Sequence, residues 1–451
     1  MARLVEPRTL KGFRDYPPEL MIPREHLMET ARRVFRSYGF NPIDTPALEY
    51  TEVLLAKVED GAEIGKQLFR FTDAGGRDVA LRFDLTVPLA RFVSQHAATL
   101  GLPFKRYHIA SVWRGENPQA GRFREFAQCD FDTIGSSSVA ADGEIALVIC
   151  DLLEALGVER FEVRVNHRLV LNELLATLGL GADAVTPVLR ALDKLPKIGV
   201  DGVRAELCAP PAAGGAGATS TQADAVIAMA STTGTNASVL AVLDARFPGS
   251  PGVAALRELD EIVRTAGVAE GQVRIDLSIC RGLDYYTGTV FETFLTDLPG
   301  IGSVCSGGRY DDLTGRYTKQ ALPGVGASLG LDRLLAALEQ LGALDASVKT
   351  AAPVLITRFD ATRTGDYQRI ARMLRALGIG CEVYPDAKKL GPQLQYAERK
   401  GFTVALIAGP DEFATGTWKV KALAARTETA VAESALVDEV RRVLAHVAAD
   451  R

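Results

Sequence analysis

Two runs of alternating polar and apolar residues, joined by one short loop, constrain the fold of this chain more than any other feature. The first run is "FKRYHIASVWRGEN" (104–117), the second is "EFAQCDFDTIG" (125–135), and the loop between them contains proline and glycine. Alternation with a period of two is typical of a strand with one buried face. We therefore predict antiparallel sheet from about residue 80 to residue 134, with "LRFDLTV" (81–87) as a further strand.

The polar faces of these predicted strands have an unusual composition. The last strand would present an aromatic ring, an amide and two carboxylates on one side: Phe126, Gln128, Asp130 and Asp132. The run 81–87 would present Arg82, Asp84 and Thr86. A polar face that meets only water is the common case for antiparallel sheets. Carboxylates, an amide and arginines are also the groups that would bind a small zwitterion, so both interpretations stay open.

Helical patterns occupy much of the remaining chain. Apolar residues recur every three or four positions over residues 20–38 and around residues 140–156, which is typical of amphipathic helices. Residues 170–270 are rich in alanine and leucine, and a flexible glycine-rich loop interrupts them at residues 209–222. We read residues 170–270 as a helical insertion between two parts of one sheet.

Strand patterns resume at residues 273–278 and continue through two glycine-rich segments, "CSGGRYDD" (305–312) and "GVGASLGLDRLL" (324–335). The second segment predicts a strand that enters a helix with Arg333 in its first turn. Glycine allows close approach of a ligand to the backbone, and a helix N-terminus favours anions. Beyond residue 352 the pattern becomes β-α-β-α-β.

These patterns divide the chain into four parts. The predicted parts are a core of residues 1–169 and 271–340, an inserted helical domain of residues 170–270, a link of residues 341–352 and an α/β domain of residues 353–451. A length of 451 residues also favours two or three domains over a single core.

Composition excludes several classes of protein. The chain is 47% hydrophobic and 24% charged, which is ordinary for a folded protein, and no apolar run approaches the roughly 20 residues of a membrane span. The N-terminus lacks the apolar segment of a secretory signal. The six cysteines are scattered without a CxxC pair, which argues against a disulfide framework and a structural zinc site. We expect a cytoplasmic protein with no membrane partner and no metal held by protein side chains.

Charge is unevenly distributed. Residues 351–451 carry 15 Lys and Arg against 12 Asp and Glu, within a chain of net charge −5. This mild surplus favours a polyanionic partner for the last domain, although chance variation in surface charge explains it equally well.

Taken in order, several segments resemble the signature motifs of class II aminoacyl-tRNA synthetases, and in particular the histidyl-tRNA synthetase family. "YGFNPIDTPALEY" is similar to motif 1, "RYHIASVWRGENPQAGRFREFAQCDFD" to motif 2 and "GVGASLGLDRL" to motif 3. "RGLDYYTG" (281–288) and "SGGRYDDL" (306–313) resemble the two motifs peculiar to the histidine enzymes. The N-terminal "KGFRDYPPE" and the last domain also fit. The resemblance implies an antiparallel-sheet class II catalytic core (an α+β fold) with a mainly helical insertion and a C-terminal α/β anticodon-binding domain.

The resemblance also implies an activity and its partners. Histidine and ATP would form histidyl-adenylate, and the histidyl group would then pass to the 3′ end of tRNA(His). Mg²⁺ would accompany ATP, and Pro46 of motif 1 would lie at a homodimer interface. No nucleophile of the enzyme is needed, because catalysis consists of positioning and charge stabilisation.

Residue roles follow from the same motifs. The family pattern assigns catalysis to Arg281 and Arg114. It assigns histidine binding to Asp84, Leu85, Thr86, Arg114, Gln128, Asp132, Arg281, Tyr285 and Tyr286. It assigns ATP binding to Arg114, Glu116, Phe126 and Arg333, and contact with the tRNA acceptor end to Gln119 and Arg124.

Two departures and two alternatives accompany the resemblance. Asp84 and Asp132 stand where some bacterial members carry glutamate, so the exact contacts of these shorter side chains are open. One alternative is a non-catalytic paralogue such as the regulatory subunit of ATP phosphoribosyltransferase, but the arginines of all three catalytic segments are present here. The other is a synthetase-like enzyme that adenylates a different amino acid or acts without tRNA, against which Asp132 and Tyr286 argue.

Overall fold

The structure is a computed structural model that describes residues 4–55, 63–118, 121–279, 286–318, 322–344 and 348–449. The chain forms two compact units. The first comprises Met1–Arg14 and Leu27–Leu341, and the second comprises Asp15–His26 and Gly342–Arg451. This division does not test the predicted limits of the insertion and of the link, which remain predictions. No helix in the described residues is long and apolar enough to span a membrane.

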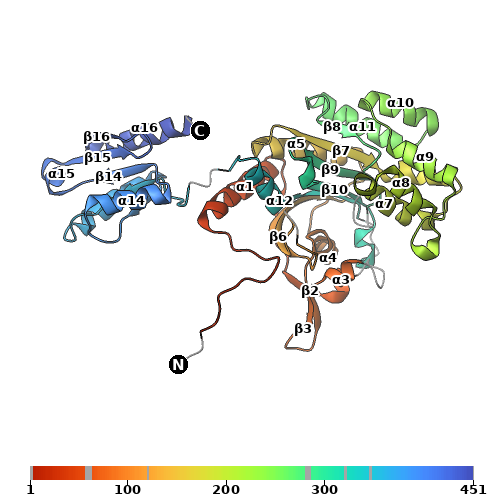
Figure 1. Cartoon of the computed structure of the whole chain (residues 1–451), viewed down its shortest axis with the longest axis horizontal. Coiled ribbons are helices and arrows are strands. Elements are labelled where there is room, and N and C mark those ends of the chain that lie inside the picture. Colours follow the sequence, from red (N-terminus) through yellow and green to blue (C-terminus); the bar gives the residue numbers. More distant parts are fainter. Residues whose placement is uncertain are drawn as a thin grey trace. The chain divides into compact units, whose positions relative to one another are not determined.

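An eight-stranded sheet forms the centre of the first unit (Figure 1). The strands follow the order β1 (Asn41–Pro42), β5 (Phe104–Trp113), β6 (Glu125–Ile134), β11 (Gly324–Gly330), β10 (Cys305–Tyr310), β9 (Thr289–Leu295), β7 (Phe161–His167) and β8 (Val273–Ile275). The six inner strands pair antiparallel, while β1 and β8 pair parallel with their neighbours at the two edges.

The predicted hairpin is confirmed, and its register fixes the two faces of the sheet. Phe104 pairs with Ile134 at one end, and Trp113 pairs with Glu125 at the loop end. Helices α5 (Val139–Ala155) and α12 (Leu331–Gln340) pack against strands of the sheet. Apolar side chains such as Phe131 and Leu329 are fully buried, so burial of this layer stabilises the core.

The prediction that residues 81–87 form a strand is wrong. Strand β4 (Asp78–Leu81) ends at Leu81, and α4 (Thr86–His96) begins five residues later. The Oδ1 atom of Asp84 accepts a hydrogen bond from the Val87 amide at 3.0 Å, and so satisfies one of the free amides at the helix start. The alternating residues 81–87 therefore span the end of a short strand, a turn and the first residues of a helix. β4 instead belongs to a small sheet with β2 (Leu48–Tyr50) and β3 (Arg70–Thr72).

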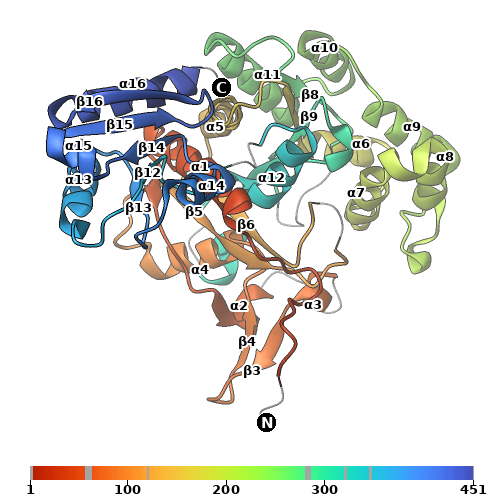
Figure 2. The same ribbon diagram turned by 60° about the vertical axis from the view of Figure 1, so that its left-hand side comes forward.

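Helices occupy most of residues 168–265, as predicted. They are α6 (Arg168–Thr177), α7 (Val185–Asp193), α8 (Leu195–Cys208), α9 (Ser220–Ala230), α10 (Asn236–Arg246) and α11 (Pro251–Thr265). The predicted flexible loop contains one short 3₁₀ turn, and α9 begins at a capping box between Thr219 and Gln222. Figure 2 shows α7, α8 and α9 grouped away from the sheet of the first unit.

The remaining elements of the first unit are short or lie near its N-terminus. They are α1 (Pro18–Ser37), of which the first half belongs to the second unit, α2 (Thr51–Leu54) and α3 (Glu63–Gln67). The predicted helices over 20–38 and 140–156 correspond to α1 and α5.

A five-stranded mixed sheet forms the second unit. The strand order is β13 (Cys381–Val383), β12 (Val354–Ile356), β14 (Val404–Ile407), β15 (Thr417–Ala422) and β16 (Thr427–Ala432). The helices are α13 (Thr364–Ala376), α14 (Leu390–Lys400), α15 (Pro410–Thr415) and α16 (Leu436–Ala449). The first three strands are parallel and confirm the predicted β-α-β-α-β pattern, while the antiparallel strands β15 and β16 extend it.

Candidate active site

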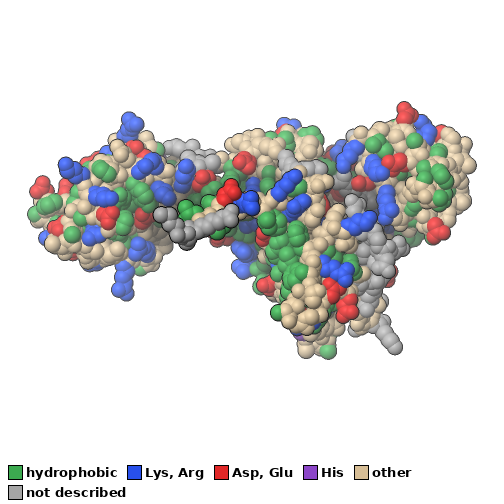
Figure 3. All heavy atoms as spheres, turned by 60° about the horizontal axis from the view of Figure 1, so that its bottom comes forward, with side chains coloured by type: hydrophobic (Ala, Val, Ile, Leu, Met, Phe, Trp, Pro, Cys, Tyr) green, Lys and Arg blue, Asp and Glu red, His purple; other side chains and the backbone are tan. Residues whose placement is uncertain are grey.

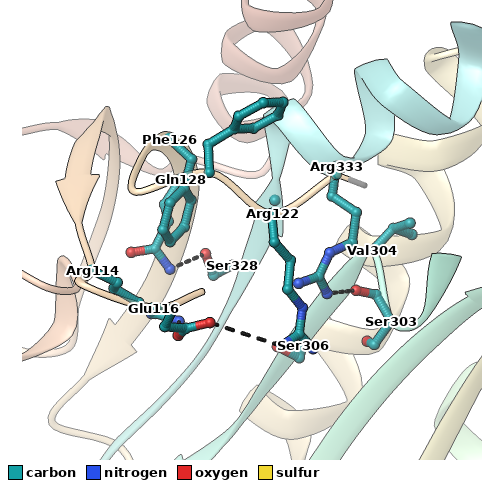
Figure 4. A pocket seen from close by; sticks show the side chains of 13 residues that line it. Arg114, Glu116, Arg122, Phe126, Gln128, Ser303, Val304, Ser306, Ser328 and Arg333 are labelled. Atoms are coloured by element: carbon teal, nitrogen blue, oxygen red, sulfur yellow. Dashed lines mark hydrogen bonds and ion pairs between the residues drawn. The ribbon is translucent and has the colours of Figure 1, made fainter. Parts of the chain in front are cut away.

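Two adjoining hollows, of about 310 and 130 Å³, lie among the polar residues of the eight-stranded sheet. Both are lined by Arg114, Glu116, Arg122, Gln128, Ser303, Ser306, Ser328 and Arg333. The larger hollow adds Asp84, Thr86 and Tyr286, and the smaller adds Phe123 and Phe126. Figure 4 shows side chains from β6, β11 and α12 around the smaller hollow. Residues far apart in the sequence thus share one elongated site.

Strand register places the polar residues of the sheet in rows. Asp132 pairs with Arg106 on one side and with Gly326 on the other. Asp130 lies in the same way between His108 and Ser328. Gln128 donates a hydrogen bond from Nε2 to the Ser328 hydroxyl at 2.9 Å (Figure 4). Residues directly opposite one another on neighbouring strands project from the same face of the sheet. The polar side chains predicted on β6 therefore lie beside polar side chains of β5 and β11.

Asp84 reaches the larger hollow from the start of α4 and not from a strand. It is 1% exposed, and its Oδ2 atom has no hydrogen-bond partner among the described residues. Burial raises the pKa of Asp84 to about 6. Thr86 also lines this hollow. Leu85 is fully buried and lines neither hollow, and its carbonyl lies 3.4 Å from Arg106 Nη2, within hydrogen-bonding distance.

Asp132 and Tyr286 each lie against one of two facing glycines, and Tyr286 lines the larger hollow whereas Asp132 lines neither. Gly308 of β10 faces Gly326 of β11. A Cβ atom on Gly326 would lie 2.1 Å from Asp132 Oδ1, and one on Gly308 would lie 2.9 Å from Tyr286 Cδ1. The hydroxyl of Tyr310 donates a hydrogen bond to Asp132. Only glycine leaves room for the carboxylate and the ring at these positions.

Arg114 and Glu116 begin the loop after β5. The Nε atom of Arg114 donates to the Phe83 carbonyl at 2.9 Å, and its guanidinium lies 5.1 Å from the centre of the Phe126 ring. Glu116 lies 4.0 Å from Arg114 and 3.8 Å from Arg122. Phe126 therefore presents an aromatic face within a strongly cationic wall.

Arg333 reaches both hollows from the first turn of α12. Its Nη1 atom donates a hydrogen bond to the Ser303 carbonyl (Figure 4). The preceding residue, Asp332, accepts from the Ala127 amide at 2.6 Å and so ties the helix to β6. The predicted position of Arg333, at the start of a helix after a glycine-rich strand, is confirmed.

Three of the predicted residues, Gln119, Arg281 and Tyr285, lie outside the described residues. Arg124, predicted to meet tRNA, donates from Nε to the Glu116 carbonyl at 3.1 Å and from Nη1 to the Lys11 carbonyl at 3.3 Å. Its guanidinium is thus hydrogen-bonded to backbone carbonyls of the loop after β5 and of the N-terminal segment.

Several residues described above were not predicted as functional, among them Arg106, Asp130, Tyr310 and Ser328, and also Arg122, Phe123, Ser303 and Ser306, which line the hollows. The side of β6 that carries Asp130 was predicted, and pairing the hairpin symmetrically about its loop would have placed Arg106 opposite Asp132. Ser328 and Tyr310 lie some 200 and 180 residues from their partners, so no local pattern could have joined them.

Comparison with known proteins agrees with this geometry. A family model described as histidyl-tRNA synthetase matches residues 12–334, and one described as an anticodon binding domain matches residues 354–443. A histidine–tRNA ligase of Rhodopirellula baltica is 56% identical over 96% of both chains, and one of Treponema denticola is 48% identical over 91% of both. The crystal structure of histidyl-tRNA synthetase from Nostoc sp. PCC 7120 superposes with a TM-score of 0.87 at 33% identity and covers 97% of this chain and 100% of that one.

The similarity extends over both units, and the two curated relatives, at 56% and 48% identity, are both named histidine–tRNA ligase. The architecture is that of a class II synthetase with a C-terminal anticodon-binding domain. This chain belongs to the histidyl-tRNA synthetase family.

Proposed function

We propose that this chain activates L-histidine with ATP and transfers it to the 3′ end of tRNA(His). The observation that carries the proposal is a pair of buried acceptor oxygens on two residues that line the larger hollow. Asp84 Oδ2 and Gln128 Oε1 have no hydrogen-bond partner among the described residues. Leaving a buried acceptor unpaired costs about 1–3 kcal/mol, and the α-ammonium of an amino acid would supply the missing donors.

The amino acid side chain would then extend toward Tyr286 and Asp132. An ionised carboxylate accepts hydrogen bonds at about four positions, so Asp132 retains room for a ring N–H beside its bond from Tyr310. A site built to hydrogen-bond a polar ring rejects amino acids that lack it by about 10⁴–10⁵. We assign histidine recognition to these two residues, together with Tyr285.

ATP would occupy the cationic end of the site. Arg114 and Arg333 line it from two sides, and Phe126 would stack on the adenine ring. The carboxylate of histidine would attack the α-phosphorus in line and release pyrophosphate. Arg114 and Arg281 would stabilise charge that develops on the phosphate oxygens, a task that suits the planar guanidinium.

The carboxylates present fit a Mg²⁺ ion that arrives with ATP. The described residues contain no group of three or more His, Cys, Asp or Glu side chains that could hold a metal. Mg²⁺ in nucleotide sites is commonly held by one or two carboxylates and by substrate phosphates, and Glu116 and Glu292 line the larger hollow. When bound, the ion would neutralise phosphate charge.

The second unit would bind the anticodon end of tRNA, and Gln119 and Arg124 would meet the acceptor end. On the face drawn in Figure 3, Lys and Arg side chains are spread over the second unit instead of gathering in one patch. Binding would therefore depend on several separate phosphate contacts, each of which adds to the salt dependence of affinity.

A homodimer and a cytoplasmic location complete the proposal. Motif 1 runs into β2, where Leu48 and Tyr50 are 38% and 48% exposed and would be covered by a second copy. The five described cysteines are free thiols, as is usual in a reducing compartment. Sedimentation at micromolar concentration would measure the oligomer.

Histidine-dependent exchange of pyrophosphate into ATP, measured across the twenty amino acids, tests the activation step. We expect exchange with histidine alone, followed by charging of tRNA(His) transcripts. Exchange with a different amino acid, or none with any, would contradict the assignment.

A further inference from the structure

Arg106 of β5 is a buried cation beside the carboxylates of Asp130 and Asp132. It is 0% exposed, and its Nη2 atom lies 2.7 Å from Asp132 Oδ2 and 3.8 Å from Asp130 Oδ2. Its Nε and Nη1 atoms have no hydrogen-bond partner among the described residues. A fully buried guanidinium is expensive to desolvate, and replacing a buried ion pair with apolar side chains is often stabilising. Fold stability alone therefore does not explain this arginine.

Asp130 and Asp132 both lie within 3.8 Å of the Arg106 guanidinium, which carries one positive charge. Burial raises the pKa of Asp130 to about 7, Arg106 lowers it, and the nearby Asp132 raises it again. Burial also raises the pKa of Asp132, while Arg106 and the Tyr310 hydroxyl lower it. Because the charge of Asp132 raises the pKa of Asp130, the two carboxylates titrate as a pair. The shorter ion pair and the bond from Tyr310 favour the negative charge on Asp132 and the proton on Asp130.

The other titratable groups around the pair do not replace Arg106. Burial lowers the pKa of His108 to about 4, so this ring is neutral at pH 7. Among the described residues, the other titratable groups that interact electrostatically with these carboxylates are Arg82, Asp84, Tyr286, Cys305 and Tyr310. Arg82 is directed elsewhere, since its guanidinium donates to the carbonyls of Thr45 and Ser111.

We propose that Arg106 is a positioning residue for amino acid selection, which keeps Asp132 ionised and oriented as the acceptor for the imidazole N–H. The proposal rests on the proposed function, because it acts through histidine recognition. A protonated Asp132 would present a hydroxyl donor to the ring N–H, and two donors repel. Arg106 would therefore act on histidine affinity and leave the ATP end of the site unaffected.

Steady-state pyrophosphate exchange between pH 6 and pH 9 tests this role, with KM measured separately for histidine and for ATP. For Arg106→Met we expect the KM for histidine to rise about 10–100-fold at pH 7, since loss of an adjacent opposite charge shifts a carboxyl pKa by about 1–3 units. The KM should recover toward the wild-type value as the pH rises and Asp132 ionises again. The KM for ATP should change less than about twofold, as expected for uniform loss of amino acid binding.

Three further variants make the result specific. Arg106→Lys keeps the charge but not the planar fork, so it should raise the KM for histidine less and keep the wild-type pH profile. In the pair Arg106→Met with Asp132→Asn the two effects should not add, because both act through one contact. Arg164→Met is the control, since Arg164 of β7 also pairs with two carboxylates, Glu162 of the same strand and Asp276 just after β8, but lines neither hollow. It should leave the KM for histidine within about twofold of the wild type.

Several outcomes would overturn the proposal. They are a wild-type KM for histidine in Arg106→Met, an equal rise in both KM values without pH recovery, or full additivity with Asp132→Asn. If Arg106→Met does not fold, an unchanged KM for histidine in Arg106→Lys would overturn it as well. Absence of histidine-dependent exchange in the wild-type protein would instead contradict the proposed function.

Discussion

Asp84 shows how one side chain can serve both the fold and the ligand. Its Oδ1 atom accepts a hydrogen bond from the first turn of α4, and its Oδ2 atom is buried without a hydrogen-bond partner among the described residues. The first contact stabilises the helix start, while the second is unfavourable until a donor arrives. Gln128 is similar, because its Nε2 atom donates to Ser328 while its Oε1 atom is buried without a partner among the described residues. Both residues therefore have an oxygen that a bound ligand could pair with.

The raised pKa of Asp84, about 6, predicts a pH dependence of histidine binding. Binding of the ammonium requires the ionised form, so affinity should be full above pH 6 and fall about tenfold per unit well below it. In Asp84→Asn this acid limb should disappear, while the titration of the substrate imidazole remains in both proteins. Equilibrium dialysis of histidine from pH 4.5 to pH 8 measures this affinity. If affinity falls equally at low pH in both proteins, Asp84 is not the group that binds the ammonium.

The raised pKa of Asp84 also predicts how the stability of the unliganded protein depends on pH. The folded pKa of Asp84 lies above the unfolded value of 3.8, so its contribution to stability is present below pH 3.8 and is lost as the pH rises through 6. At pH 7 the unliganded Asp84→Asn protein should therefore be more stable than the wild type, on the order of 1–3 kcal/mol. Urea unfolding at pH 7 tests this, and a less stable variant would show that the carboxylate is not strained.

Arg281 lies outside the described residues, and its role rests on the family motif. We predict that Arg281→Ala lowers the single-turnover rate of adenylate formation by roughly 10²–10³, the usual cost of removing one preorganised donor. Histidine affinity should fall far less than this rate, although the family pattern also places Arg281 among the histidine-binding residues. A variant with a near-normal rate of adenylation would remove Arg281 from the mechanism.

At the scale of elements, the β5–β6 hairpin and the α/β pattern of the second unit could be predicted from the sequence. Their period of two and their alternation of strand and helix are local signals. The helix at Thr86 could not be separated from a strand, because its first turn continues the alternation of 81–87. Contacts such as Gln128–Ser328 join strands 200 residues apart, and they depend on a register that only the assembled sheet fixes.

The glycine pair between β10 and β11 predicts a selective defect. In Gly308→Ala the new methyl group would lie 2.7 Å from the Thr289 carbonyl oxygen and 2.9 Å from the Tyr286 ring, so both the strand backbone and the ring must shift. We expect the KM for histidine to rise at least about tenfold, the effect of a misplacement near 1 Å being of this order or larger, with the KM for ATP nearly unchanged. Gly300→Ala, where a Cβ meets nothing within 4 Å, is the matched control. Equal effects of the two substitutions would contradict the idea that Gly308 is needed to leave room for the Tyr286 ring.

At the scale of the whole molecule, the two units divide the proposed work. Each has its own buried core, as the fully buried Trp418 and Tyr367 of the second unit illustrate. Separate cores can fold and act separately. The residues that line the two hollows all belong to the first unit.

Truncation after Leu341 should therefore leave histidine-dependent pyrophosphate exchange but impair tRNA charging. Affinity for tRNA should fall, and its dependence on salt should become shallower because fewer phosphates are neutralised. Filter binding of tRNA between 50 and 200 mM salt (about the range over which such slopes are measured) tests this. A melting curve should accompany it, because residues 15–26 group with the second unit. Unchanged tRNA affinity with lost exchange would assign a supporting role to this unit.

The neighbouring positions of β6 and β11 in the sheet have a consequence for synthesis on the ribosome. β6 ends at Ile134 and β11 begins at Gly324, so about 190 residues must be translated before β6 gains its second partner, roughly 10–40 s at 5–20 residues per second. During that interval the nascent hairpin would have an open edge that carries Asp130 and Asp132 in water. Ribosome-bound chains that stop before Gly324 should therefore be cleaved by protease within 104–134, whereas chains that extend past Gln340 should resist.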